Sequence, residues 1–206
     1  MEFIRKIFII VLAIGLPLIL KAQYSEKVLI AFEQSYALEK ANDFRKSAKV
    51  LKDIYIADSY EINLRLGWLQ YNAGLFDESK EYYQKAMTLM PYSEEAKFGL
   101  ILPLAARGEW DEVAKLYKQI LANNPGNTRA LYNLGLIHYN RKEWAQAVGY
   151  FQKLVDLYPF GYDGLLMLAW TNLQLGKTRE ARVLFNKVLL YSPGDTSALE
   201  GLGLMK

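Results

Sequence analysis

Histidine, cysteine and paired carboxylates carry much of protein catalysis and metal binding, and this sequence offers few of them. Its 206 residues include one histidine, His138, and no cysteine, which excludes thiolate metal sites, disulfides and a cysteine nucleophile. His138 lies in an apolar segment, where a hydrogen-bonded core histidine is the expected role. The neighbouring acids Asp77 and Glu78, or Asp111 and Glu112, point in different directions on a helix and do not form a catalytic pair.

Sequence motifs for phosphate loops, dinucleotide folds, nucleophile elbows and zinc proteases are absent. The formal charge is only +3, and the body of the chain has no basic run that would favour nucleic acid. An apolar content of 52% is sufficient for one continuous core. We therefore expect a protein that is not an enzyme, has no metal or cofactor, and does not bind nucleic acid.

The N-terminal segment has the pattern of a secretory signal. Arg5 and Lys6 precede an apolar run over residues 7–20, and small or polar residues follow around Ala22 and Gln23. This order is typical of a signal peptide over residues 1–22, and fourteen apolar residues are short for a membrane span. The prediction is an exported protein of the periplasm or cell envelope. An uncleaved membrane anchor over residues 3–20 is the alternative.

A fixed spacing of 34 residues organises the rest of the chain and separates four prolines. A residue that favours a helix N-terminus stands two positions after each of them, and Ser59 lies one period earlier. Such a period is the sequence sign of stacked repeats. The prolines are Pro91, Pro125, Pro159 and Pro193, and the helix-starting residues are Ser93, Asn127, Gly161 and Asp195.

Each period contains two amphipathic helices of about thirteen residues joined by a short turn. The first helix carries a small residue where the two helices cross, and the second carries a small residue followed one turn later by an aromatic one. In this order the positions are Gly67, Gly135 and Ala169; Ser47, Ser79, Ala147 and Ala181; and Tyr83, Tyr117, Phe151 and Phe185.

This pattern resembles the tetratricopeptide repeat family. The resemblance implies an all-α, right-handed α-solenoid of stacked helix-turn-helix repeats. The expected units are a degenerate first hairpin over 23–59, four repeats over 60–93, 94–127, 128–161 and 162–195, and a short C-terminal capping helix over 196–206.

Two parts of the array depart from the pattern. In the unit 94–127, Ile101 and Val113 replace the small crossing residues, and Pro103 lies inside the first helix, where it should kink that helix. This unit is either a tolerated divergence or a local opening that admits a ligand side chain. At the C-terminus, Leu204 and Met205 end the chain with apolar side chains, which either fray or form an edge for self-association.

In this family the first helices line a concave surface that binds extended or helical peptides. The resemblance therefore predicts a partner-binding groove rich in aromatic residues. The lysine and asparagine that grip a C-terminal carboxylate in one subgroup are replaced by Leu64 and Trp68, so that clamp is missing. The predicted groove residues are Leu64, Trp68, Tyr71, Phe98, Leu102, Tyr132, Leu136, Tyr139, Leu166, Trp170 and Leu173.

The sequence thus predicts an exported scaffold or adaptor that binds a protein or peptide partner along this groove within a cell-envelope assembly. Two other functions remain open at this point. Rows of tryptophan and tyrosine also suit a carbohydrate-binding protein of the envelope. A retained N-terminal segment would instead give a membrane-anchored structural component.

Overall fold

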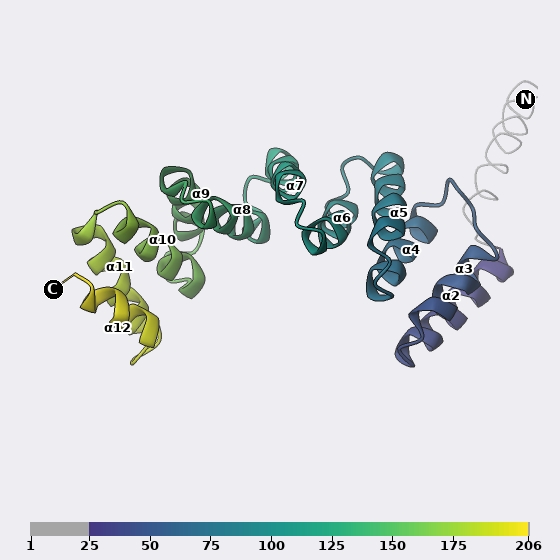
Figure 1. Ribbon diagram of the computed structural model, residues 1–206, viewed down its shortest axis with the longest axis horizontal. Helices are drawn as coiled ribbons and strands as arrows, with labels where there is room; N and C mark the ends of the chain where they lie inside the picture. The colour runs from purple at the N-terminus through teal and green to yellow at the C-terminus, as the bar shows by residue number, and fades with distance from the viewer. Residues whose placement is uncertain (1–24, 206) are drawn as a thin grey trace, which may run out of the picture.

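The computed structural model describes residues 25–205, and within this range every regular element is a helix. The eleven described helices follow one another as hairpins in an open arch, with α2 and α12 at opposite tips (Figure 1). The predicted all-α solenoid is confirmed. The helices are α2 (Glu26–Lys40), α3 (Phe44–Lys52), α4 (Tyr60–Asn72), α5 (Phe76–Leu89), α6 (Glu94–Ala106), α7 (Trp110–Asn123), α8 (Thr128–Asn140), α9 (Trp144–Leu157), α10 (Tyr162–Gln174), α11 (Thr178–Tyr191) and α12 (Thr196–Gly203).

The first helix of each repeat begins where the proline spacing predicts. Ser59, Ser93, Asn127, Gly161 and Asp195 are the N-cap residues of α4, α6, α8, α10 and α12. All of them except Gly161 accept a hydrogen bond from the backbone N–H three residues later, at 2.8 to 3.3 Å. Each bond satisfies one of the backbone donors left free at a helix start.

Small residues and aromatic rings fit together where helices cross, as the repeat pattern requires. The Tyr83 ring of α5 lies against Gly67 of its own hairpin and against Gly99 of the next hairpin. A Cβ atom at Gly67 would stand 2.8 Å from the ring, so neither glycine leaves room for a larger side chain. The Ser79 hydroxyl donates to the Gly67 carbonyl at 2.7 Å and fixes the same crossing.

The α6–α7 hairpin is the loosest of the four full repeats. Fewer residues of its two helices come close to each other than in the other hairpins. Ile101 and Val113 are both buried at the crossing, where the other repeats place glycine, alanine or serine, and their bulk holds the helices apart. Pro103 is buried within α6 and does not interrupt it, since the helix continues to Ala106.

The first hairpin is degenerate, as its sequence predicts. Helix α3 has nine residues, whereas α5 has fourteen, because the chain leaves α3 at Asp53 and continues in turns to Ser59. Its crossing is built from serines: the Ser47 hydroxyl donates to the Ser35 carbonyl at 2.7 Å, and the two hydroxyls lie 2.8 Å apart. Leu51 stands where the later repeats carry an aromatic ring.

The predicted signal or anchor over residues 1–22 lies outside the described residues. Among the residues that are described, no helix combines the length and apolar character needed to cross a membrane. Helix α12 covers the last repeat through Ala198 and Gly201, both buried, while Leu199 and Leu204 are 50% and 66% exposed. The apolar C-terminal edge is therefore open to solvent.

Candidate functional site

The eleven residues predicted to line a groove are all partly exposed, and four of them meet in one cavity. Leu64 and Trp68 of α4 lie beside Phe98 and Leu102 of α6 in a cavity of about 760 Å³. The helices α2, α4, α6 and α8 all contribute to it. The remaining lining residues are Phe32, Tyr36, Tyr60, Glu61, Arg65, Tyr83, Met90, Glu95, Gly99 and Arg129.

One wall of this cavity comes from α2, which the sequence pattern did not assign to the groove. Phe32 and Tyr36 lie one helical turn apart with ring centroids 6.4 Å apart, and Tyr36 is half exposed. Across the cavity, the Trp68 ring is 38% exposed and its centroid lies 6.4 Å from that of Tyr71. The concave face thus has aromatic side chains that are held by packing and still accessible.

Arg65 places a nearly buried cation in this cavity. Its side chain is only 9% exposed, its guanidinium carbon lies 3.9 Å from the Tyr36 ring centroid, and its Nη2 pairs with a Glu39 carboxylate oxygen at 2.5 Å. Glu39 also accepts a hydrogen bond from Trp68 Nε1 at 2.6 Å. Burial alone would raise the pKa of Glu39, but the Arg65 and Trp68 donors outweigh it and hold the pKa below its ordinary value. The three side chains lock α2 to α4.

Arg129 is the second cation at the cavity. Its guanidinium carbon lies 4.2 Å from the Phe98 ring centroid, and within the described chain it has no ion-pair partner. Glu61 and Glu95 also line the cavity, and Glu95 accepts a hydrogen bond from the Tyr60 hydroxyl at 3.3 Å. Both signs of charge therefore surround an apolar centre, an arrangement suited to polar main-chain groups and mixed side chains.

The other predicted groove residues do not join this cavity. Tyr132 packs edge-on against Phe151 with centroids 6.2 Å apart, and Tyr139 packs against Trp144 at 4.8 Å. Trp170 donates to the Ser197 hydroxyl at 2.9 Å. Tyr71, Leu166 and Leu173 likewise pack against neighbouring side chains, and Leu136 lines a separate pocket. The four predicted groove residues that meet in one cavity thus lie in the N-terminal half of the arch.

His138 is buried in the hairpin between α8 and α9. Its Nδ1 is hydrogen-bonded to the Glu143 carboxylate, and its ring stacks on Tyr150 with centroids 5.3 Å apart and planes 15° apart. These contacts fit the core role expected from the sequence. Among the described residues, no group of three histidine, cysteine or acidic side chains is arranged to hold a metal ion.

Family models identify the repeats directly. Three models described as tetratricopeptide repeats match residues 60–92, 99–162 and 163–195. The chain belongs to the tetratricopeptide repeat family. The matched models describe repeats and none describes a catalytic domain.

Known tetratricopeptide repeat structures share this fold. A tetratricopeptide repeat protein from Parabacteroides merdae aligns over 88% of this chain and 73% of its own, with a TM-score of 0.75 and 20% identity.

Curated relatives match only part of their own length. The CTR9 homologue of Arabidopsis thaliana is 26% identical over 132 residues, which are 63% of this chain and 12% of that protein. The type IV pilus assembly protein PilF of Pseudomonas aeruginosa is 30% identical over 154 residues, which are 72% of this chain and 59% of that protein. The similarity therefore covers the repeats and leaves large parts of these relatives unmatched.

Proposed function

We propose that this tetratricopeptide repeat protein is an adaptor that binds an extended protein segment in the cavity between α2, α4, α6 and α8. The proposal depends on the accessible rings of Trp68, Phe98 and Tyr36, which share this cavity with two cations. Arg65 is ion-paired and stacked on Tyr36, and Arg129 is stacked on Phe98. Aromatic residues and arginine dominate the binding energy of protein interfaces. A volume of about 760 Å³ lies within the range of ligand sites.

The rigidity of the cavity favours binding. Trp68 is held by its hydrogen bond to Glu39, and Arg65 by both Glu39 and Tyr36, so these groups lose little freedom when a ligand arrives. The type IV pilus assembly protein among the relatives bears a name that fits such a scaffold role. Within this proposal, the adaptor contributes a preformed surface and the partner contributes an apolar segment.

We further propose that the mature protein is exported and works in a cell-envelope assembly. The support is the order of Arg5, Lys6 and the apolar run over residues 7–20. The intact mass of the protein from the native envelope fraction tests this. A mass that lacks residues 1–22 is expected, an uncleaved mass in the membrane fraction would favour the anchored alternative, and a cytosolic protein of full length would contradict export.

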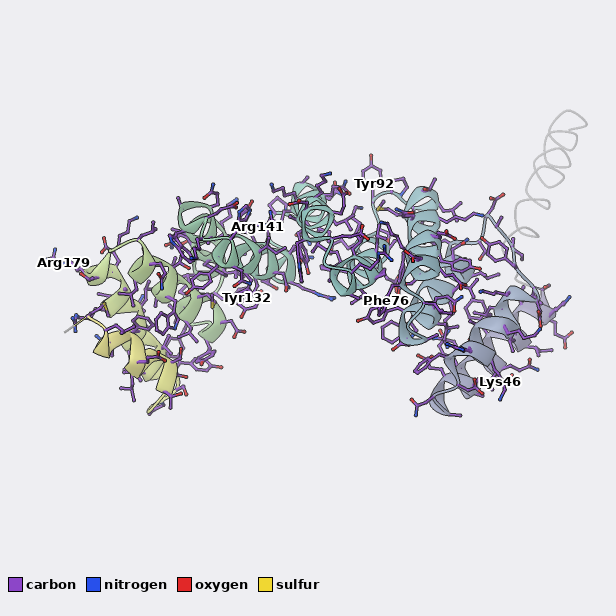
Figure 2. The ribbon with its side chains drawn as sticks, in the orientation of Figure 1. Lys46, Phe76, Tyr92, Tyr132, Arg141 and Arg179 are labelled. Carbon is purple, nitrogen blue, oxygen red and sulfur yellow. The ribbon has the colours of Figure 1, made fainter. Side chains whose placement is uncertain are left out.

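A crosslinked pull-down from native cells tests the binding site. Trp68→Ala combined with Phe98→Ala should abolish capture of the partner, whereas Tyr92→Ala should leave it unchanged. Tyr92 is the matched control because it is an aromatic residue that is 82% exposed and projects from the convex side of the arch (Figure 2). Circular dichroism confirms that all variants are folded.

The affinity for the purified partner gives the quantitative result. Loss of one hot-spot aromatic residue costs about 2 kcal/mol or more, which is about 30-fold in Kd. A partner that binds the double variant as tightly as the parent would show that the cavity is not the binding site. Quenching of tryptophan fluorescence by soluble glycans, with no protein partner captured, would favour the carbohydrate-binding alternative.

A further inference from the structure

A second pocket of about 450 Å³ lies between α7 and α8, at the junction that follows the loosest hairpin. Its lining combines apolar and aromatic side chains with the amides of two asparagines and one guanidinium. Tyr117 and Ile137 are nearly buried, while Trp110 is 49% exposed. The lining residues are Trp110, Tyr117, Asn133, Leu136, Ile137, Asn140 and Arg141.

Among the described residues, Trp110 has no aromatic partner ring, unlike the residues at the same position in the two neighbouring repeats. In the preceding repeat, Phe76 begins the second helix and lies 5.7 Å from the Tyr71 ring at the end of the first. In the following repeat, Trp144 lies 4.8 Å from Tyr139 in the same way. At this position the α6–α7 hairpin has Ala105, so one edge of the array lacks a ring that the neighbouring repeats supply themselves.

The polar groups of the pocket have unused hydrogen-bonding capacity. Asn140 makes no hydrogen bond within the described chain through its side chain, and Asn133 uses its Nδ2 to donate to the Arg129 carbonyl at 2.8 Å, which leaves Oδ1 available. Arg141 pairs through Nη2 with Asp111 at 2.8 Å and stands at the rim. A purely aliphatic occupant would cover these amides without satisfying them, which is costly.

The pocket is linked to the proposed peptide site by shared lining residues. Arg129 lines the 760 Å³ cavity and also a cavity of about 390 Å³ formed with Tyr132 and Asn133. Asn133 in turn lines the pocket beside Trp110. The three cavities are thus adjacent through Arg129 and Asn133, and under the proposed function one extended chain would lie over all three.

We infer that this pocket receives a tyrosine or tryptophan side chain of the partner polypeptide. Such a side chain places a flat apolar ring against Trp110 and Leu136 and a polar tip near the amides of Asn133 and Asn140. The ring would then lie beside Trp110, whose hairpin has Ala105 where the two neighbouring hairpins have tyrosine. This inference rests on the proposed function, because it names a specificity pocket for the same bound segment.

Small probes test the pocket without the partner. Titration of the ¹⁵N-labelled protein with N-acetyl-tyrosinamide, at roughly millimolar concentration, should shift the Trp110 indole signal saturably. That signal is assigned by its loss in Trp110→Phe. N-acetyl-leucinamide should shift it with an affinity at least about tenfold weaker, because it carries no ring to stack on Trp110.

Asn133→Met should fill the pocket and abolish the shift. Met167 occupies the same position in the last repeat, so the side chain is compatible with this place in the array. Asn123→Met, at an exposed site near the end of α7, is the matched control and should behave as the parent does. No saturable shift with the tyrosine probe, equal binding of the leucine probe, or a shift produced only by maltotriose would each overturn the inference.

Partner binding separates this inference from the proposed function. Asn133→Met should weaken partner binding at least about tenfold, a typical effect of losing an interface anchor. If Trp68→Ala with Phe98→Ala abolishes binding while Asn133→Met has no effect, the pocket inference is wrong and the adaptor function stands. If the tyrosine probe binds the pocket but Trp68→Ala with Phe98→Ala does not weaken partner binding, the proposed binding site in the first cavity is wrong.

Discussion

Glu39→Gln should loosen the first hairpin from the rest of the arch. The change removes the charge that pairs with Arg65, whose side chain is only 9% exposed, while the amide oxygen still accepts from Trp68. Breaking a buried ion pair costs about 3–5 kcal/mol. Because Glu39 is 23% exposed and the Tyr36 ring still faces the guanidinium at 3.9 Å, we expect a smaller cost of about 2 kcal/mol.

Hydrogen exchange is the assay that can localise this loss. Among the described helices, the main contacts of each hairpin are with the hairpins next to it in the chain. A defect between α2 and α4 therefore lowers the free energy of opening of the terminal hairpin first. A loss of about 2 kcal/mol corresponds to about 30-fold faster exchange in α2 and α3. Exchange in α9 to α11 should not change.

Asp53→Asn on the same hairpin is the control. It breaks the Lys49–Asp53 pair, whose side chains are 72% and 61% exposed, and such surface pairs contribute about 0–1 kcal/mol at most. If Glu39→Gln accelerates exchange no more than Asp53→Asn does, the Glu39–Arg65 pair does not hold the hairpin.

Acidification should reduce the difference between Glu39→Gln and the parent. Burial raises the pKa of Glu39, but the donors Arg65 and Trp68 outweigh it, so the pKa lies below the ordinary 4.5. For a lowered carboxyl pKa, the stabilisation is complete above pH 4.5 and is lost as the pH falls through the folded value. A difference that grows towards low pH would contradict this electrostatic account.

Four substitutions test the crossings, turns and caps of the repeats by thermal unfolding, where 1 kcal/mol shifts Tm by about 2–4 °C for a chain of this size. Gly99→Ala places a methyl group against the Tyr83 ring and should lower the free energy of unfolding by about 1–3 kcal/mol. Gly149→Ala has open space around it and should raise the free energy of unfolding by about 0.5–1 kcal/mol. Equal effects of the two changes would contradict the close approach at Tyr83. Lys142→Gly should stabilise by about 0.5 kcal/mol, since Lys142 has φ 61° where three other repeats have glycine, and a loss would argue against strain there. Asn127→Ala should cost about 1 kcal/mol because it removes the cap of α8, and an unchanged Tm would mean that water replaces that cap fully.

The repeat period accounts for most of what the sequence predicts correctly. Once the prolines set the 34-residue spacing, the N-cap residues, the crossing residues and the aromatic wedges follow by counting. The 34-residue spacing does not predict the bounds of the first hairpin, because its second helix ends early at Lys52 and no proline follows that helix. The register of α2 against α4 therefore could not be deduced, and the contacts of Glu39 and Tyr36 with Arg65 were not predicted.

The sequence predicts the helix face that carries the candidate site, but not which side chains on that face stay accessible. Helical register placed Leu64, Trp68, Phe98 and Leu102 on one side of neighbouring first helices, and they meet in a cavity. Register alone does not say which side chains the neighbours cover. Trp170 is on the same side, yet it packs on Phe185 with centroids 5.2 Å apart, because α12 closes over it.

The sequence did contain a signal for the pocket beside Trp110. Comparison of one column of the repeats shows Tyr71, Ala105, Tyr139 and Leu173, and Ala105 is the one residue too small to reach the following helix start. In the same repeat, Ile101 and Val113 add bulk at the crossing. The small residue at position 105 and the bulky residues at positions 101 and 113 all lie in the hairpin that lines one side of the pocket. Under the proposal that the pocket receives a partner side chain, these departures are a specialisation of the repeat, and the Asn133→Met experiment decides between specialisation and drift.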